Sequence, residues 1–232
     1  MKKSIWITAI AAILWAGCSK NEETVVPEEG VMQLQVLHPS QSRATATDFE
    51  RGDRLGLYVT DYAGESVAPL LQISGNWANN IAATYDGSSW NLAKKIFWSS
   101  NLMDVYAYYP YMTPASIDAQ PFAVALDQTT EGTEEELGGY EASDFLWAKT
   151  TGVSSSAESV MLQFKHRCSK LVVKLVKGAD YDGDFLTTSE LYIHNVVPTA
   201  TIDFTTGAVV KDIFGEPATI KARSIIYRYL LF

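Results

Sequence analysis

The chain has 232 residues, 47% of them hydrophobic, with 18 basic and 27 acidic side chains. This length suffices for one large or two ordinary domains with a core of their own. An acidic chain without a basic patch argues against nucleic acid as a partner and against charge-driven docking on anionic lipid. Two cysteines are too few for a disulfide scaffold, so a hydrophobic core must hold the fold together.

The N-terminus has the anatomy of an exported lipoprotein. Lys2 and Lys3 precede an apolar run, and two small residues lead into Cys18. The run is shorter than the roughly 20 apolar residues of a membrane-spanning helix. We therefore predict a signal peptide at 1–17 and an acylated Cys18 as the mature N-terminus, outside the cytoplasm. A plain cleaved signal is the alternative, because Trp15 stands where a lipobox usually has leucine.

The segment that follows, residues 18–30, is polar and acidic and predicts a tether between the lipid and the folded body. Removal of residues 1–17 leaves 215 residues with a net charge of −11. Membrane attachment would then depend on lipid at Cys18 rather than on charge. Because one acyl chain gives only marginal binding, stable anchoring requires two or three chains on this residue.

From Val31 onward, apolar and polar residues alternate with a period of two. This pattern, rich in β-branched and aromatic residues, is typical of half-buried antiparallel strands, and turn residues such as Asp86-Gly87 and Thr206-Gly207 separate them. No later segment has a long helical period. The sequence therefore predicts an all-β sandwich fold. The expected strands cover residues 32–36, 55–59, 105–109, 122–126, 160–164, 171–175, 191–193 and 202–204.

Two polar stretches suggest how this fold is divided. Residues 127–143 are acidic with almost no apolar side chains, which predicts a mobile surface loop. Residues 152–159 are small and polar and could form a long hairpin loop or a seam between domains. Placing the seam there predicts an N-terminal β-sandwich domain at 31–155 and a C-terminal one at 156–232.

The residue types that carry catalysis are scattered. His38, His166 and His194 lack a second ligand at metal-binding spacing. Cys168 would have no intramolecular partner, and its strand-like surroundings favour a buried inert thiol over a nucleophile. The aspartates at 180–184 lack the glycine and glutamate positions of a calcium loop, so a solvated turn is the better interpretation. We predict no catalytic residue, metal or cofactor, and hence no enzyme.

One aromatic run allows two interpretations. Tyrosines dominate residues 106–111, and Trp77, Trp90 and Trp98 could join them as a platform on which sugars stack. Alternatively, alternate tyrosines fill the core of the sandwich while the others cover a sheet face, and this is the favoured interpretation.

Four segments occur in a fixed order along the chain: residues 47–58 (TDFERGDRLGLY), 104–111 (DVYAYYPY), 143–148 (SDFLWA) and 162–171 (LQFKHRCSKL). Each resembles a signature of fimbrillin-like proteins. Singly they are weak, but together and behind a lipoprotein signal they are fairly specific. They extend the resemblance over roughly residues 31–205.

The resemblance implies two transthyretin-like β-sandwich domains, exported as an outer-membrane lipoprotein by Bacteroides-type bacteria. In polymerising family members, an arginine-specific protease removes an N-terminal segment with the first strand, and a strand of another subunit fills the groove. In this chain, residues 31–37 would be the removable strand and Arg43 the processing site. A plain surface arginine is the alternative. The partners would be other fimbrial subunits, through donor-strand exchange, and a host or glycan ligand.

The resemblance also bears on the C-terminus. Family members generally extend beyond this length, so the second domain is expected to be incomplete and to expose apolar surface between residues 171 and 210. A genuine C-terminal donor strand is the alternative. The sequence thus predicts a structural fimbrial subunit, or an accessory or anchor subunit. The alternative function is a glycan-binding surface lipoprotein.

Overall fold

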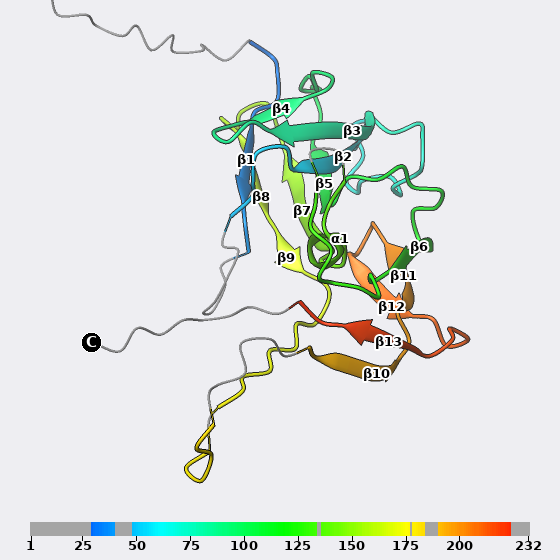
Figure 1. Cartoon of the computed structure of the whole chain (residues 1–232). Helices are drawn as coiled ribbons and strands as arrows, with labels where there is room; N and C mark the ends of the chain where they lie inside the picture. Colours follow the sequence, from blue (N-terminus) through cyan, green and yellow to red (C-terminus); the bar gives the residue numbers. More distant parts are fainter. Residues whose placement is uncertain (1–28, 40–47, 134–135, 177, 184–189, 224–232) are drawn as a thin grey trace, which may run out of the picture.

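The computed structural model describes residues 29–39, 48–133, 136–176, 178–183 and 190–223 (Figure 1). Cys18 and Arg43 both lie outside these ranges. Within them, the only helix is the four-residue α1 (Gly139–Ala142). The strands are β1 (Leu34–Leu37), β2 (Arg54–Asp61), β3 (Ala78–Tyr85), β4 (Trp90–Leu92), β5 (Met103–Tyr109), β6 (Gln120–Ala123), β7 (Leu146–Val153), β8 (Val160–Gln163), β9 (Lys165–His166), β10 (Tyr192–Val196), β11 (Thr199–Asp203), β12 (Ala208–Lys211) and β13 (Ala218–Lys221).

An antiparallel six-stranded sheet in the order β4-β3-β2-β5-β7-β9 forms the middle of the fold. All seven residues of β5, which pairs with β2 and β7, are buried. Successive side chains of a strand point to opposite faces, so Val105 and Ala107 join one hydrophobic core, whereas Tyr106 and Tyr108 join another. Both faces of β5 are thus covered, which explains why its tyrosine-rich sequence is almost continuously apolar.

The first core lies between this sheet and a two-stranded sheet of β1 and β8, which lie side by side in Figure 1. The two strands are parallel, with Leu34 opposite Val160 and Leu37 opposite Gln163. The fully buried members of this core come from β2, β3, β5, β7, β8, the segment before β1 and the residue between β8 and β9. The largest of them are Met32, Leu55, Leu57, Met103, Leu146, Leu162 and Phe164.

The second core lies on the opposite face of the six-stranded sheet. Ile202 of β11 and Phe204 pack there against Tyr106 and Tyr108. Ile202 belongs to the three-stranded sheet β12-β11-β6, in which β11 pairs antiparallel with both neighbours, and Phe204 directly follows β11. A further two-stranded sheet, β10-β13, lies beyond it (Figure 1). The central sheet thus has a covering layer on each face.

The predicted all-β fold is confirmed. Period-two segments at 55–59, 105–109 and 160–164 coincide with β2, β5 and β8, and the segment at 202–204 overlaps β11. The predicted strand at 122–126 is shifted, because β6 begins at Gln120 and ends at Ala123.

The predicted strand at 171–175 is wrong. These residues alternate in sequence, yet none of them pairs with another strand in the described part of the chain. Leu171, Val173 and Leu175 are all exposed. Alternation allows a strand, but the strand needs a neighbour to satisfy its backbone donors and acceptors.

The boundary between two domains stays a prediction. Residues 160–166 form β8 and β9, which pair with β1 and β7 of the N-terminal sheets. A seam at 155/156 would separate these paired strands. A division after His166 would in turn separate β6 from β11, so strands from both parts of the chain contribute to shared sheets.

The acidic loop at 127–143 is held by hydrogen bonds between its own residues and by one to the strand segment that precedes it. The Gly139 amide donates to the Thr130 carbonyl at 3.1 Å. The Ser143 hydroxyl donates to the Gly139 carbonyl at 2.6 Å and accepts from the Ala125 amide at 2.9 Å. The mobility of this loop stays a prediction, but its two ends are held in place.

Candidate assembly surface

The N-terminal segment, residues 29–38, is inserted between two parts of the fold. On one side, the Met32 amide donates to the Ile96 carbonyl at 2.8 Å, and the Trp98 amide donates to the Gly30 carbonyl at 2.9 Å. On the other side, the Val160 amide donates to the Gln33 carbonyl at 2.8 Å. The segment therefore completes the layer that covers the first core.

The side chains of this segment are part of the first core. Met32 is fully buried, and Leu34 and Val36 pack against the core while half-buried. Their neighbours include Leu162 and Phe164. Removing the segment would expose apolar side chains and leave an unpaired edge on β8, and such an edge is a template for another strand.

The chain after residue 38 returns to the same core through Phe49. The Phe49 ring contacts the rings of His38, Trp90, Tyr109 and Phe164 edge-on, with centroids 4.9 to 5.8 Å apart. Edge-to-face contacts of this kind stabilise packed aromatic rings. Phe49 therefore fixes the chain that enters β2 against the C-terminal end of the N-terminal segment.

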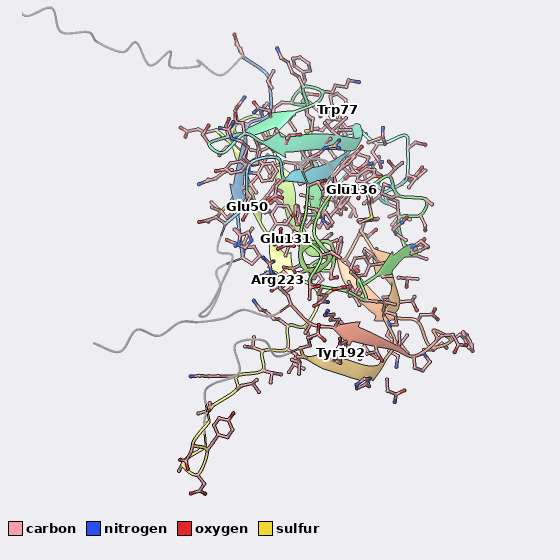
Figure 2. All side chains as sticks on the ribbon, in the orientation of Figure 1. Glu50, Trp77, Glu131, Glu136, Tyr192 and Arg223 are labelled. Atoms are coloured by element: carbon pink, nitrogen blue, oxygen red, sulfur yellow. The ribbon has the colours of Figure 1, made fainter. Side chains whose placement is uncertain are left out.

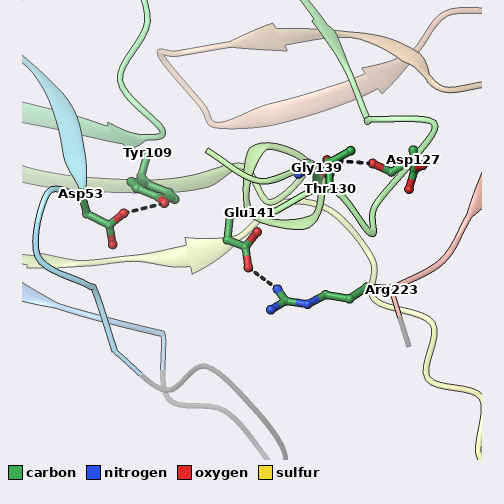
Figure 3. A network of polar contacts seen from close by, with 8 residues as sticks. Asp53, Tyr109, Asp127, Thr130, Gly139, Glu141 and Arg223 are labelled. Carbon is green, nitrogen blue, oxygen red and sulfur yellow. Dashed lines mark hydrogen bonds and ion pairs between the residues drawn. The ribbon is translucent and has the colours of Figure 1, made fainter. Parts of the chain in front are cut away.

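Other residues of the sequence signatures close the same region. Asp53 accepts a hydrogen bond from the Tyr109 hydroxyl at 2.9 Å (Figure 3) and one from the Glu50 amide at 2.7 Å. Burial, followed by the charge of Asp53, raises the pKa of Tyr109. Gly56 lies opposite Tyr108, and a Cβ at Gly56 would lie 2.3 Å from the Tyr108 ring. Glycine is required there because the tyrosine ring occupies the place of a side chain.

A second set of signature residues joins the two cores. Asp144 contacts the His166 ring nitrogen at 2.8 Å, linking the start of β7 to β9. The Trp147 indole donates to the Phe204 carbonyl at 2.7 Å, and Arg167 stacks over the same indole. Gly207, at φ +70°, lies directly against the Trp147 ring, where a Cβ would come within 2.4 Å. The signatures thus describe packing between strands, not a reactive centre.

The C-terminal region presents a contrasting surface. Five apolar residues between 171 and 176 are exposed, with Val176 at 75%, and Figure 1 shows this stretch leading away from the sheets. Val210, Ile213 and Phe214 are exposed on and after β12. A hollow of about 750 Å³ lies over β6, β11 and β12 and includes Phe122, Val210 and Ile213 in its lining. The expectation of exposed apolar surface between residues 171 and 210 therefore agrees with the structure.

Polar contacts tie this region to the body at α1. Arg223, after β13, forms an ion pair with Glu141 (Figure 3). Arg223 and Lys170 also lie over the Tyr140 ring, 5.5 and 5.4 Å from its centroid. Because Glu141 and Arg223 are partly exposed, this link is weak in comparison with the buried cores.

The three histidines do not gather in one place. His38 and His166 lie near each other, with ring centroids 6.1 Å apart, whereas His194 is on β10 and contacts Thr219. No group of three His, Cys, Asp or Glu side chains in the described ranges could hold a metal ion. Cys168 packs half-buried against the second core, and burial raises its pKa, which disfavours the nucleophilic thiolate. Cys18 and Arg43 lie outside the described residues.

The aromatic platform proposed for sugars is wrong as a whole. Tyr106, Tyr108 and Tyr109 are buried in the two cores, so their faces are not available for stacking. Trp90 and Trp98 are half-buried against the first core. Only Trp77 of the suggested set is exposed, and Figure 2 shows it beside β3, at the opposite end of this view from Tyr192 on β10.

These observations define the class of protein: an all-β protein of packed antiparallel sheets whose N-terminal segment completes one layer. The family model described as fimbrillin-like matches residues 42–229. The chain therefore belongs to the fimbrillin-like family, a family of fimbrial structural subunits rather than of enzymes.

Individual relatives agree with this assignment. The chain is 31% identical over 193 residues to a Bacteroides ovatus protein named "Putative fimbrium tip subunit Fim1C". The match covers 72% of this chain but only 34% of that relative, so the chain spans about a third of its length. No helix in the described ranges is long and apolar enough to span a membrane.

Two solved structures share the fold. A protein from Bacteroides uniformis described as a putative cell adhesion protein has a TM-score of 0.59 at 21% identity, covering 86% of this chain and 72% of that one. A similarly described protein from Bacteroides ovatus has a TM-score of 0.53 at 20% identity, covering 82% of this chain and 72% of that one. At these identities the likeness concerns the fold.

Proposed function

We propose that this protein is a lipid-anchored structural subunit of a fimbrium, in the shaft or as an accessory or anchor subunit, and that it assembles by β-strand exchange. Cys18 would carry the lipid at the outer membrane. Cleavage after Arg43 would release the N-terminal segment together with the lipid at Cys18, so that the lipid-anchored form is the precursor of assembly. A strand from a sibling subunit would then take the place of the segment. Membership of the fimbrillin-like family supports the subunit role.

The observation that carries the exchange step is the position of residues 29–38. This segment contributes side chains to the first core and backbone hydrogen bonds to two neighbours, yet its covalent connection to β2 runs through residues 39–53 alone. A single cut near Arg43 would therefore separate it from the body without breaking another strand. The remaining groove would have the hydrogen-bonding edge and the apolar floor that an incoming strand needs.

The energetics favour replacement over simple loss. Fully burying a side chain such as Met, Leu or Val stabilises a protein by about 1.5–3 kcal/mol. Because Met32, Leu34 and Val36 are buried or half-buried, loss of the segment would cost several kcal/mol, a large part of a typical stability of about 5–15 kcal/mol. A donor strand with alternating apolar residues would restore this contribution.

A reversible lock on β1 tests the exchange step. Gln35 and Met161 are direct neighbours on the parallel strands β1 and β8, and both side chains are exposed. A Gln35→Cys, Met161→Cys double variant in a Cys168→Ser background should form a disulfide that keeps β1 in place. We expect no SDS-resistant ladders from the oxidised protein, even after cleavage, and ladders after reduction. Each single-cysteine variant is the control and should assemble without a reductant.

Processing is tested at the arginine itself. Arg43→Ala should retain the N-terminal segment in intact-mass analysis and should fail to polymerise. Arg51→Ala, which changes an exposed arginine in the next turn, is the matched control and should be processed normally. Polymerisation of the disulfide-locked or uncleaved protein would contradict assembly through this groove. Such a result would leave the fimbrial role intact, with assembly through a different surface.

A further inference from the structure

A small hollow at the end of β2 shares no lining residue with the proposed assembly groove. It has a volume of about 230 Å³ and lies between the end of β2 and the loop at 69–77. This volume is below the about 300–1,000 Å³ of pockets for small-molecule ligands. The hollow is therefore suited to one side chain of a protein partner.

The accessible walls of this hollow are apolar and fixed in position. Leu70 is 81% exposed, and Trp77 is about half exposed. The Trp77 indole donates to the Phe97 carbonyl at 2.8 Å, so its nitrogen is satisfied within the protein. Leu71 anchors the loop that carries these walls in the second core. A tryptophan held in this way offers a large contact area at little cost in side-chain entropy.

Asp61 gives the hollow a negative charge and is the charged member of its described lining. Partial burial acts to raise the pKa of the Asp61 carboxyl, but hydrogen bonds from the Ala63 backbone and from the Ser99 and Asn101 side chains outweigh it and lower the pKa. The carboxylate accepts from the Ala63 amide at 2.7 Å and keeps further acceptor capacity. At neutral pH the hollow thus presents one carboxylate beside two apolar walls.

This arrangement matches the chemistry of a lysine side chain. The aliphatic stem of a lysine covers apolar surface while its ammonium group stays at a polar edge. The same ammonium is attracted to the face of a tryptophan ring and to a carboxylate. An acidic side chain would be repelled by Asp61, and an apolar one would cover the carboxylate without bonding to it.

The chain itself presents a segment with the matching properties. Residues 169–176 (SKLVVKLV) contain two lysines and no acidic residue. None of residues 171–176 pairs with a strand in the described part of the chain, and five apolar side chains of this stretch are exposed. In an extended chain Val172, Lys174 and Val176 lie on one face, because alternate side chains point the same way. That face carries a lysine between two apolar side chains.

The segment and the hollow lie at different ends of the molecule. Figure 1 shows residues 171–176 leading away from the sheets beyond β9, whereas Figure 2 shows Trp77 beside β3 at the other end of the same view. A contact between them therefore joins two copies of the chain and not two parts of one copy. Because two different surfaces meet, such a contact is head-to-tail and can repeat from copy to copy.

We propose that Lys174 of one copy of this chain inserts into the hollow of a second copy. Its stem lies against Leu70 and Trp77, and its ammonium group donates to Asp61. The ammonium has three donors, so Lys174 can bond to Asp61 while keeping contacts within its own copy. One such contact is small and weak, and its strength comes from repetition in an array of subunits.

This contact uses neither the N-terminal segment nor the proposed cleavage, so it goes beyond strand exchange and can be tested without it. The test uses the full chain in detergent with Arg43→Ala, which keeps the N-terminal segment in place. One sample carries a photoreactive benzoylphenylalanine in place of the exposed Val172, and it is mixed with an isotope-labelled copy without this group. Mass spectrometry after irradiation then identifies the labelled peptides that have been captured.

We expect capture of labelled peptides that contain Leu70 or Trp77. The isotope label shows that the cross-link joins two copies. Absence of any cross-link between copies would overturn the proposal. Capture of residues 121–123 or 210–213 instead would also overturn it, because the segment would then dock on the hollow over β6, β11 and β12. Either result would leave strand exchange through the groove of β1 untouched.

A pair of charge-removing variants tests the contact between Lys174 and Asp61. Asp61→Asn keeps an oxygen that accepts from the Ala63 amide but removes the charge, and it should lower the cross-link yield about threefold or more. Lys174→Gln should have a similar effect. The double variant should be no weaker than the stronger single variant, because both remove the same interaction. Full multiplication of the two effects would contradict a direct contact.

Two further variants test the wall of the hollow and the specificity of the lysine. Leu70→Ser changes an exposed side chain, so it should leave the fold intact, and it should lower the yield about threefold. Lys211→Gln removes an exposed lysine on β12 and is the matched control for Lys174→Gln. It should leave the yield within about twofold of the parent. An equal loss from Lys211→Gln and Lys174→Gln would show that only the overall charge matters and would overturn the proposal.

Discussion

The N-terminal and C-terminal halves of the molecule have similarly apolar sequences but use them differently. Around β5, every residue is buried because the central sheet is covered on both faces. From Leu171 to Val176, the apolar side chains are exposed because no described segment pairs with them. The alternating pattern therefore identifies the residues that can be buried. The presence of neighbouring strands determines which of these residues are buried.

The largest contrast should appear between two phenylalanines. Phe164 is fully buried in the first core, and Phe214 is 87% exposed after β12. Phe164→Ala should lower the free energy of unfolding by about 3–5 kcal/mol because it leaves a cavity. Phe214→Ala should change it by less than about 0.5 kcal/mol. Urea unfolding of both variants measures the difference, and equal effects would mean that the C-terminal half buries Phe214 in solution.

An intermediate effect is expected at high pH from the buried tyrosines of the N-terminal half. Burial raises the pKa of Tyr58 to about 12, and burial also raises those of Tyr108 and Tyr109. Below pH 10 these groups are neutral in both states, so their contribution to stability is complete. Above the unfolded value of 10.0, the unfolded chain loses its protons first, and stability falls as the pH rises towards the folded pKa values.

Tyr58→Phe should therefore make the alkaline loss of stability less steep between pH 10 and pH 12. The exposed Tyr181 lies in the C-terminal half, and Tyr181→Phe is the comparison variant. Circular dichroism during urea unfolding at a series of pH values measures both. A parent protein whose stability is constant up to pH 12 would show that the tyrosines ionise without unfolding the cores.

The smallest effect is expected where the two halves meet. Arg223→Ala removes the ion pair with Glu141 and the stacking on Tyr140. Because these groups are partly exposed, the loss in global stability should be below about 1 kcal/mol. Hydrogen exchange should instead accelerate locally in β13. Lys211→Ala, on β12, is the control, and an unfolding transition that splits into two would mean that this link joins the halves more strongly than its exposure suggests.

Much of the fold was predictable because alternation is a local signal. The segments that became β2, β5 and β8 carry it clearly, and the tyrosine-rich run was correctly interpreted as core. Two pairings could not be predicted from the sequence, namely that of Leu34 with Val160 and that of β6 with β11. Both join segments that are distant in sequence. The strand predicted at 171–175 failed for the same reason.

The candidate sites were less accessible to sequence reasoning. Cys18 was found from local chemistry and Arg43 from the resemblance to fimbrillin-like proteins, and the roles of both stay predictions. Trp77 was noticed as one of several aromatic residues, but its distinction is its exposure, which only the packing of Trp90 and Trp98 reveals.

The pairing of β1 with β8 has a consequence for the order of folding. Leu34 and Val160 are separated by more than half of the chain, so this contact closes a very long loop. Contacts of such high sequence separation form slowly, since the entropy of loop closure is lost before any interaction compensates for it. The antiparallel neighbours of β5 can pair while β1 is still free. During folding, the first core should therefore pass through a state in which its central sheet is formed and the edge of β8 is open.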